Sequence, residues 1–328
     1  MKQRNYSIDF LKIIFTIVIA IHHFQEAIGI TFISHGDLAV EFFFMVSGYY
    51  LMDSFSQNYR WGGQKQSACD YILRRYKKLY PHYLFSLVVL VGALILASRE
   101  ADYILDKLIQ TIPELFMLQD IGVFYYSGSN YPAWYLSVLM VLSYFLYLGL
   151  SLNKTVCVKV IYPLLLLLGS TLLFSGEDNS IVHWSAYGVL YMPLIRGLVD
   201  MIIGILIWKC VHADFKIDFV FSLMLNIMAW FLIIVAMFGE KTQDSLVLLG
   251  FAILLVLYFS QSNLFSKFTD IKLFGTIGKY TYAIYLNHSL VIRIVKLFGE
   301  KLQTIWLVIV FLVVLFAYSV VTENIVRY

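Results

Sequence analysis

The stretch Asp9–Phe24, DFLKIIFTIVIAIHHF, places one aspartate, one lysine and two histidines inside an apolar run that is long enough to enter a bilayer. A charge that faces lipid at the bilayer centre costs roughly 3 kcal/mol or more. At about 100° per residue, Lys12 and His23 share one helix face and lie roughly 16 Å apart along the axis. Asp9 and Glu26 fall within about 60° of that face. We therefore expect this polar stripe to face the interior of a helix bundle or a wet cavity.

The composition of the chain is typical of a membrane protein. Of its 328 residues, 60% are hydrophobic and only 14% are charged, and the mean hydropathy is +0.78. These values are far from the usual balance of a soluble domain. The net charge of +3 is too small to indicate a nucleic-acid partner. Because no internal repeat or linker divides the sequence, residues 1–328 are expected to form a single all-α, polytopic membrane domain.

Ten segments are apolar enough and long enough to be spanning helices, at about 20 residues each. They are residues 8–28, 38–55, 79–98, 133–151, 157–174, 190–208, 217–238, 244–261, 280–298 and 303–322. Lys and Arg residues concentrate in alternate connections, beginning with Lys2 and Arg4 and continuing with the run from Arg74 to Lys78. By the positive-inside rule, this asymmetry predicts cytoplasmic termini and a multi-pass protein of the cell membrane.

One further apolar segment, Tyr103–Gln119, has helical spacing but is interrupted by Asp106, Lys107 and Pro113. This pattern predicts an interfacial helix in an outer loop rather than an eleventh span. An odd number of spans would also spoil the asymmetry of positive charge.

The three cysteines, Cys69, Cys157 and Cys210, fall near the cytoplasmic ends of predicted spans. Disulfides are rare in that compartment. Their spacing matches no metal or redox motif, so we expect them to be unpaired, small apolar residues. The sequence predicts no metal site.

A basic run, LRRYKKLYPHY (Leu73–Tyr83), precedes the third predicted span. It holds four cations in five positions and ends in Pro81 at the mouth of the span. Such runs commonly anchor a protein to anionic membrane lipid. Arg74, Arg75 and Lys78 also suit the phosphates of a soluble polyanionic donor, since the guanidinium fork matches phosphate geometry. Both interpretations stay open at this point.

Other ionisable residues lie inside predicted spans, and they include Glu41, Arg196, Asp200 and His288. His23 and Glu41 both fall toward the outer half of the bilayer. A carboxylate beside an imidazole fixes its tautomer and raises its basicity, so this pair predicts a general base. Arg196 and Asp200 are four residues apart, and they can either line the interior or pair on one helix to lock its neighbours.

Five segments, taken in order, resemble motifs of the membrane acyltransferase-3 family. They are the stretch from DFLK to His23, AVEFFFMVSGYYL (Ala39–Leu51), RRYKKLYPHY, AWYLSVL (Ala133–Leu139) and IGKYTYAIYLNH (Ile277–His288). Lys12 stands where that family usually has Arg, which removes a bidentate fork but keeps the charge. The resemblance implies transfer of an acyl group, most often acetyl from acetyl-CoA, to a hydroxyl of a carbohydrate destined for the cell surface.

The resemblance also implies roles for individual residues. Lys12, Arg74, Arg75 and Lys78 would bind the donor, His23 would be the catalytic base and Glu41 would orient it. The remaining candidates are predicted to line the substrate pocket: Asp9, Ser47, Trp134, Ser137 and His288 from these segments, and Arg196 from its place inside a predicted span. Small and aromatic residues are also ordinary at membrane helix contacts, so packing is an equal explanation for several of them. Whether His23 takes only a proton or carries the acyl group is left open.

A proton-coupled transporter or a glycan flippase is the main alternative, because intramembrane carboxylates and histidines also form proton relays. Carriers of that kind often show repeated halves and broken helices. The sequence contains no convincing repeat. A purely structural scaffold would leave the intramembrane charges unexplained.

Overall fold

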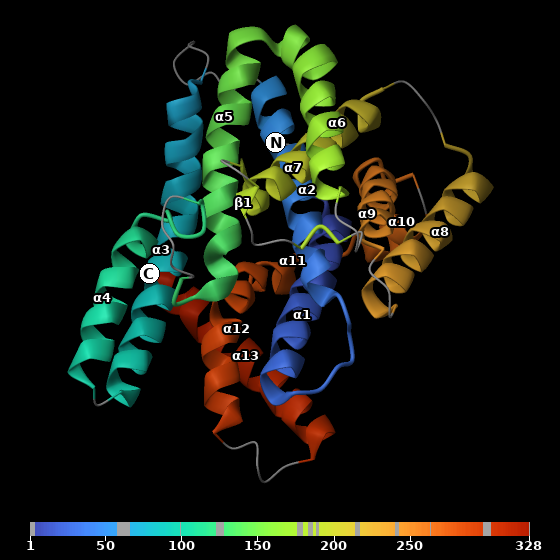
Figure 1. Cartoon of the computed structure of the whole chain (residues 1–328). Helices are drawn as coiled ribbons and strands as arrows, with labels where there is room; N and C mark the ends of the chain where they lie inside the picture. Colours follow the sequence, from blue (N-terminus) through green and yellow to red (C-terminus); the bar gives the residue numbers. More distant parts are fainter. Residues whose placement is uncertain are drawn as a thin grey trace.

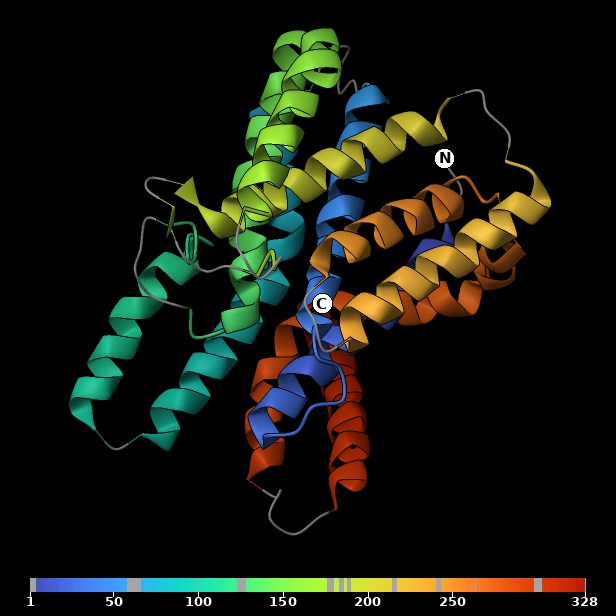
Figure 2. The same ribbon diagram turned by 45° about the vertical axis from the view of Figure 1, so that its right-hand side comes forward.

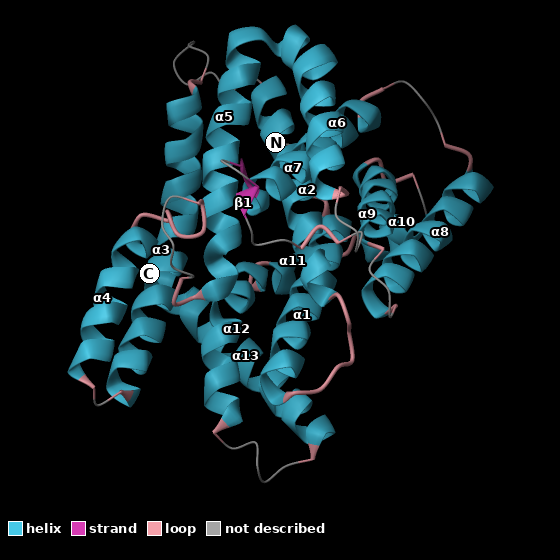
Figure 3. Ribbon diagram, in the orientation of Figure 1, coloured by secondary structure: helices cyan, strands magenta, loops and turns pink. Residues whose placement is uncertain are grey.

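The computed structural model of the chain is built almost entirely of helices, as Figure 1 and Figure 3 show. It describes residues 4–57, 66–98, 100–122, 128–175, 180–182, 186–187, 190–213, 217–239, 243–262, 264–297 and 303–327. The elements are α1 (Tyr6–Ile28), η1 (Gly36–Leu38), α2 (Ala39–Ser56), α3 (Ala68–Ala97), α4 (Ala101–Leu115), η2 (Tyr131–Ala133), α5 (Trp134–Val156), η3 (Cys157–Ile161), α6 (Tyr162–Leu173), β1 (Ala186–Tyr187), β2 (Leu190–Tyr191), α7 (Met192–Val211), α8 (Phe219–Phe238), α9 (Asp244–Phe259), α10 (Leu264–Thr269), α11 (Lys272–Gly278), α12 (Thr281–Lys296) and α13 (Thr304–Arg327).

The all-α prediction is confirmed. The strands β1 and β2 are two residues each, and they form a short antiparallel ladder immediately before α7. A helix coincides with each of the ten ranges predicted to span. Within the described residues, five helical segments are by length and composition able to cross a membrane: Tyr6–Ile28, Ala68–Ala97, Tyr131–Leu173, Phe219–Phe238 and Thr304–Arg327. The count of ten spans and the cytoplasmic termini stay predictions, and Lys2 lies outside the described residues.

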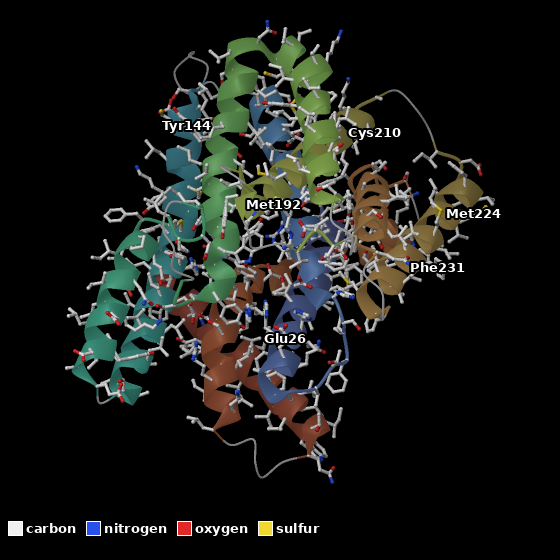
Figure 4. All side chains as sticks on the ribbon, in the orientation of Figure 1. Glu26, Tyr144, Met192, Cys210, Met224 and Phe231 are labelled. Atoms are coloured by element: carbon white, nitrogen blue, oxygen red, sulfur yellow. The ribbon has the colours of Figure 1, made fainter. Side chains whose placement is uncertain are left out.

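Two strongly apolar helices, α8 and α13, lie at the periphery of the bundle. Of the most apolar 18-residue stretch of each helix, only 28% is buried in α8 and 22% in α13. Most of the surface of each helix is therefore left for lipid. Met224 and Phe231, labelled on α8 in Figure 4, are each 63% exposed. Figure 2 shows α8 lying beside α9 on one side of the molecule. The helices that carry charge, such as α7 with Arg196 and Asp200, have those residues in the interior.

Two glycines bring α2 and α7 into close backbone contact. A Cβ atom added to Gly48 would meet the carbonyl oxygen of Met201 at 2.0 Å, and one added to Gly204 would meet that of Met45 at 2.0 Å. Small residues allow membrane helices to approach in this way. The crossing holds the first turn of α2, with Glu41, beside the first half of α7.

The chain reverses direction between α5 and α6. Asn153 has non-helical backbone angles near the end of α5, and a π-helical turn, η3, follows at Cys157. The hydroxyl of Tyr162 donates to the carbonyl of Leu146 at 2.5 Å, which ties the two helices together. Cys157, Cys69 and Cys210 are all unpaired, as expected, but only Cys157 is buried among apolar residues, whereas Cys69 is exposed.

The segment predicted to be an interfacial helix is helical over Ala101–Leu115 and lies beside α3 (Figure 1). Leu105, Leu108 and Ile112 are each about half exposed or more along one face. Their spacing of three and four residues gives the helix an apolar side without a protein partner of its own. The placement of this helix at the membrane interface stays a prediction.

Candidate active site

A cavity of about 910 Å³ penetrates the bundle among α1, α2, α3, α5, α12 and α13. This volume suits a ligand of substantial size. Two carboxylates line the cavity, those of Asp9 and Glu323. Seven cationic side chains line it as well: Arg4, Lys12, Arg74, Arg75, Lys78, Lys279 and Arg327. We refer to this space as the basic cavity.

The helix α3 supplies much of the basic wall. Its residues Tyr71, Arg75, Lys78 and His82 recur at intervals of three and four, so one helical face points into the cavity. The guanidinium of Arg75 donates to the hydroxyl of Tyr71 at 3.0 Å, which orders its position. Lys12, from α1, completes the group. All the residues predicted to bind a donor therefore meet at one cavity, although their ligand stays a prediction.

Asp9 lies at the same cavity but is engaged by cations of its own chain. Its carboxylate accepts from Arg4 Nε at 2.6 Å and lies 3.5 Å from Lys12 Nζ. Gly278 packs against it so closely that an added Cβ would lie 2.9 Å from the Cβ of Asp9. Asp9 thus holds Arg4 and Lys12 at the edge of the basic cavity and partly offsets the positive charge there.

Hydroxyl groups mark the inner end of the basic cavity. Ser47 Oγ and the hydroxyl of Tyr135 lie 3.1 Å apart, and Tyr135 also donates to the carbonyl of Phe43 at 3.1 Å. Thr16 from α1 lies in the same lining, and its hydroxyl is buried without a hydrogen-bond partner among the described residues. These groups are placed to hydrogen-bond the far end of a ligand.

His23 lies beyond this inner end and does not line the basic cavity. It follows Thr16 by seven residues, a rise of about 10 Å along α1. Its ring stacks on that of His288, with centroids 5.3 Å apart and planes at 8°, and meets Tyr131 edge-on at 5.0 Å. The side chain is 18% exposed. The stripe on α1 is therefore divided into a cavity-lining half and a histidine half, whereas we expected one continuous seam.

The expectation that Glu41 orients His23 is wrong in its geometry. His23 Nδ1 instead lies 3.2 Å from Glu26 Oε2, one turn further along the same helix. The sequence could have predicted the pairing of His23 with Glu26, because residues three apart on a helix are neighbours on its surface. The carboxylate of Glu41 is fully buried and accepts from the guanidinium of Arg196.

Glu41, Arg196 and Asp200 form a buried cluster between α2 and α7, which we call the α2–α7 charge cluster. Their exposed fractions are 0%, 3% and 1%. Both carboxylate oxygens of Asp200 are buried and have no hydrogen-bond partner among the described residues. The guanidinium of Arg196 also lies 5.3 Å from the ring centroid of Trp134, a cation–π contact. None of these side chains lines the basic cavity, so the structure does not bring Arg196 or Trp134 to the pocket predicted for them.

His288 has a defined tautomer. Its Nδ1 lies 2.6 Å from the carbonyl oxygen of Tyr285, so this nitrogen carries the proton and donates it. The other ring nitrogen, Nε2, is buried and has no hydrogen-bond partner among the described residues. Tyr285, one turn earlier on α12, lines the basic cavity. His288 consequently lies behind that tyrosine, beside His23, and holds a bare nitrogen lone pair.

Two further predicted pocket residues separate in the structure. Ser47 lines the basic cavity, whereas Ser137 is fully buried, and its hydroxyl has no hydrogen-bond partner in the described part of the chain. The neighbours of Ser137 on α5, Tyr135 and Leu136, do line the cavity. Reasoning from a motif could select the right turn of the helix but not the side chain that faces the space.

Sequence reasoning missed an ion-pair chain at the basic cavity. His82 Nε2 lies 2.8 Å from Glu323 Oε2, and Arg327 pairs with the other oxygen of Glu323. These groups join α3 to α13 at the cavity wall. The signal available was weak, because His82 directly follows Pro81 in a run dominated by lysine and arginine, and its partner is 241 residues away.

A loop between α4 and α5 fixes the ring of Tyr131 against His23. Asn130 Nδ2 donates to the carbonyl of Leu286 at 3.1 Å, and Ser289 Oγ donates to Asn130 Oδ1 at 2.8 Å. On the other side, the backbone N–H of Ser129 donates to Glu114 Oε1 at 2.5 Å. These contacts tie the loop to α12 and α4, so the aromatic wall beside His23 is held from two directions.

A family model described as an acyltransferase domain matches residues 5–323, which is nearly the whole chain. The protein belongs to the acyltransferase-3 family. It shows no significant match to a curated protein or to a solved structure. The match covers the paired histidines and the lining of the basic cavity except Arg4 and Arg327, so family membership and the two features described above concern the same domain.

Proposed function

We propose that this member of the acyltransferase-3 family is an O-acetyltransferase of the cell membrane, which transfers an acetyl group from acetyl-CoA to a hydroxyl of a cell-surface or exported carbohydrate. The observation that carries the proposal is the basic cavity, where seven cationic side chains surround about 910 Å³. A donor with several phosphates is the ligand class that such a lining favours.

In this proposal the donor phosphates bind Arg74, Arg75, Lys78 and Lys12, on the side that the sequence predicts to be cytoplasmic. The acyl arm extends toward Ser47 and the hydroxyl of Tyr135. These hydroxyls lie 3.1 Å apart at the inner end, where they can hydrogen-bond the amide and carbonyl groups of the arm. The charge therefore recognises one end of the donor and the hydroxyls guide the other.

His23 is the proposed base. Glu26 faces its Nδ1, so this nitrogen carries the proton and Nε2 keeps a lone pair. Nε2 takes the proton of the acceptor hydroxyl as its oxygen attacks the thioester carbonyl. The carbon–sulfur bond then breaks, and the departing thiolate takes a proton from the imidazolium. His288, stacked on His23, presents a second bare nitrogen, which can accept a hydrogen bond from a neighbouring hydroxyl of the carbohydrate.

The proposal requires the acyl arm to pass the tyrosine layer between the two halves of the stripe. Tyr135 and Tyr285 stand at that layer, with ring centroids 5.9 Å apart. Each is held by a hydrogen bond to a backbone carbonyl, from Tyr135 to Phe43 and from Tyr285 to Pro132. The proposal therefore requires one of these rings to change its rotamer when the donor binds.

Binding and transfer can be tested separately on the purified protein. Titration with acetyl-CoA should show about tenfold weaker binding for Lys78→Ala, because hydrogen bonds to charged groups contribute about 1.5–3 kcal/mol. Lys159→Ala is the matched control, since Lys159 is an exposed cation outside the cavity. Equal affinity of the wild type and Lys78→Ala would count against the donor site.

His23→Ala should lower acetyl transfer to carbohydrate by about 10²- to 10⁴-fold, the usual contribution of general base catalysis. Its affinity for acetyl-CoA should not change, because His23 lies outside the basic cavity. His212→Ala, a change to an exposed histidine at the end of α7, should keep the full rate. A His23→Ala enzyme that retains its rate would overturn the base assignment. Uptake of a saccharide by proteoliposomes without any acyl donor would favour the transporter alternative.

A further inference from the structure

The last two turns of α1 bring three potential metal ligands together. His22, His23 and Glu26 each direct a ligating atom to one place, and these atoms all lie within 4.8 Å of one another. Residues at i, i+3 and i+4 on a helix share a face, and helical metal sites use this spacing to present two or three ligands at once. Glu26, which is labelled near the lower end of α1 in Figure 4, has a side chain that is 59% exposed, so the cluster is open to solvent.

Two of the separations, one to each carboxylate oxygen of Glu26, are close to the edge length of a tetrahedral site. His22 Nε2 lies 3.6 Å from Glu26 Oε1, and His23 Nδ1 lies 3.2 Å from Glu26 Oε2. Zinc bonds to nitrogen and oxygen are about 2.0–2.2 Å, so two ligand atoms of one tetrahedral ion lie about 3.4 Å apart. A second carboxylate, Asp37 Oδ1, lies 3.7 Å from His22 Nε2 and adds negative charge.

The ring of His22 is held in the orientation that a metal ligand needs. Its Nδ1 lies 3.2 Å from the carbonyl oxygen of Ile33 and 3.3 Å from the backbone nitrogen of Gly36. Without a metal, Nδ1 accepts from the N–H of Gly36 and Nε2–H faces the carboxylates. With a metal on Nε2, Nδ1–H donates to Ile33, which is the usual outer-shell contact of a ligating histidine. Both tautomers therefore have a partner already in place.

The connection after α1 is clamped on this ring. A Cβ added to Gly36 would lie 2.7 Å from the Cβ of His22, so the loop passes in direct contact with the histidine. Gln25 reinforces it by accepting from the backbone N–H of Phe32 and Ile33 at 2.7 and 2.9 Å. His22 is thus preorganised for binding, which lowers the conformational cost of holding an ion.

We propose that His22 Nε2, His23 Nδ1 and Glu26 bind a divalent transition-metal ion of the zinc class, with Asp37 as the adjacent carboxylate and one position left for water. Mixed imidazole and carboxylate ligands favour such ions over magnesium or calcium. This departs from the sequence, which predicted no metal site.

The site has a regulatory consequence that rests on the proposed function. A metal on Nδ1 of His23 moves the ring proton to Nε2, which then has no lone pair for the acceptor hydroxyl. The ion also takes Glu26 away from its role beside His23. Zinc bound at this turn should therefore inhibit acetyl transfer, and it should do so from the face of the membrane on which Glu26 is exposed.

Metal binding is tested first, without any acyl donor. Equilibrium dialysis of the detergent-solubilised wild type against Zn²⁺ should give one ion per chain, and Co²⁺ in its place should give the intense visible absorption of a tetrahedral site. His22→Gln and His22→Ala should each raise the dissociation constant by more than about tenfold. His212→Ala should bind as the wild type does. Absence of bound Zn²⁺ in the wild type, or unchanged affinity in both His22 variants, would overturn the site.

Transfer is measured next, in chelator and at increasing Zn²⁺. The wild type should be inhibited with a midpoint equal to its dissociation constant, whereas His22→Gln should keep the wild-type rate in chelator and resist inhibition. Bound Zn²⁺ that leaves the wild-type rate unchanged would refute the regulatory consequence. A wild type that transfers nothing even in chelator would refute the proposed function, and the dialysis result would stand independently.

Discussion

The basic cavity and the α2–α7 charge cluster both place charge inside the bundle, but they differ in the space around that charge. At the cavity, Arg75 and Lys78 face about 910 Å³ of open space. The guanidinium of Arg75 donates a hydrogen bond to the hydroxyl of Tyr71. In the cluster, Arg196 and Glu41 are buried at 3% and 0% exposure and contact each other. A charged side chain that faces a cavity is available to a ligand, whereas a charged side chain that is paired in the packed interior contributes to the stability of the fold.

This difference has an energetic basis. Two charges removed from water regain their desolvation energy only when they pair well, and the loss of one partner leaves the other uncompensated. Cations at the cavity keep contact with solvent, so the loss of one costs the fold little. Variants in the two regions should therefore separate into effects on stability and effects on ligand affinity.

The largest effect is expected at the α2–α7 charge cluster. Arg196→Met should lower the free energy of unfolding by about 3–5 kcal/mol, because Glu41 would remain buried without its cation. Thermal unfolding in detergent measures the change. Adding Glu41→Gln to this variant should recover part of the loss, since the side chain that accepts from Arg196 in the wild type is then neutral and only Asp200 remains beside it. An Arg196→Met protein as stable as the wild type would erase the distinction between the two regions.

A smaller loss is expected where α2 crosses α7. Gly204→Ala should destabilise the protein by about 1–3 kcal/mol, because its Cβ would meet the carbonyl oxygen of Met45 at 2.0 Å. Gly92→Ala is the matched control: a Cβ there has nothing within 4 Å, and alanine is the better helix former. That variant should unfold at the same temperature as the wild type or slightly above it. If both alanine variants behaved alike, the close crossing would not be what positions the cluster.

At the basic cavity the effect should move from stability to binding. Arg75→Ala should weaken the affinity for acetyl-CoA by about tenfold, equivalent to about 1.4 kcal/mol, and leave the unfolding temperature nearly unchanged. Arg75→Lys should recover only part of the affinity, because lysine keeps the charge but lacks the fork. Calorimetric titration and thermal unfolding on the same samples compare the two quantities. A loss of stability without a loss of affinity in Arg75→Ala would reverse the assignment of this region.

The sequence was sufficient to predict the helices because periodicity and apolar length report directly on burial. Each predicted span coincides with a helix, and the segment 103–119 is helical over most of its length. The number of helices able to span is harder to predict. Interior helices such as α2 and α7 contain charged residues, which the surrounding helices bury. Their sequences are therefore less apolar, and composition alone does not distinguish them from helices that do not span.

The site was predicted less completely. Residues on one helix, such as Arg74, Arg75 and Lys78, could be grouped from spacing alone, and they do line one cavity. Partners from distant helices could not, since nothing in the sequence ties Arg196 to Glu41 or His82 to Glu323. The pairing of His23 with Glu41 failed for this reason, while the local alternative, Glu26, lay three residues away.

The smallest effect on stability is expected at a carboxylate outside the predicted spans, that of Asp120. Burial, together with the nearby Glu114, raises the pKa of Asp120 from 3.8 to about 6, although the N–H of Gly128 opposes the shift. Because the folded pKa is raised, the stability from the protonated form is complete below about pH 4 and is lost as the pH rises through about 6.

Asp120→Asn should remove this loss and gain about 1 kcal/mol at pH 7, since partial exposure discounts the full shift. Unfolding temperatures at pH 4.5 and pH 7, with the exposed Asp102→Asn as control, measure the gain. Burial raises the pKa of Glu114 as well, so a weaker slope should persist in Asp120→Asn, and a slope identical to that of the wild type would show that Asp120 keeps its charge at no cost to the fold.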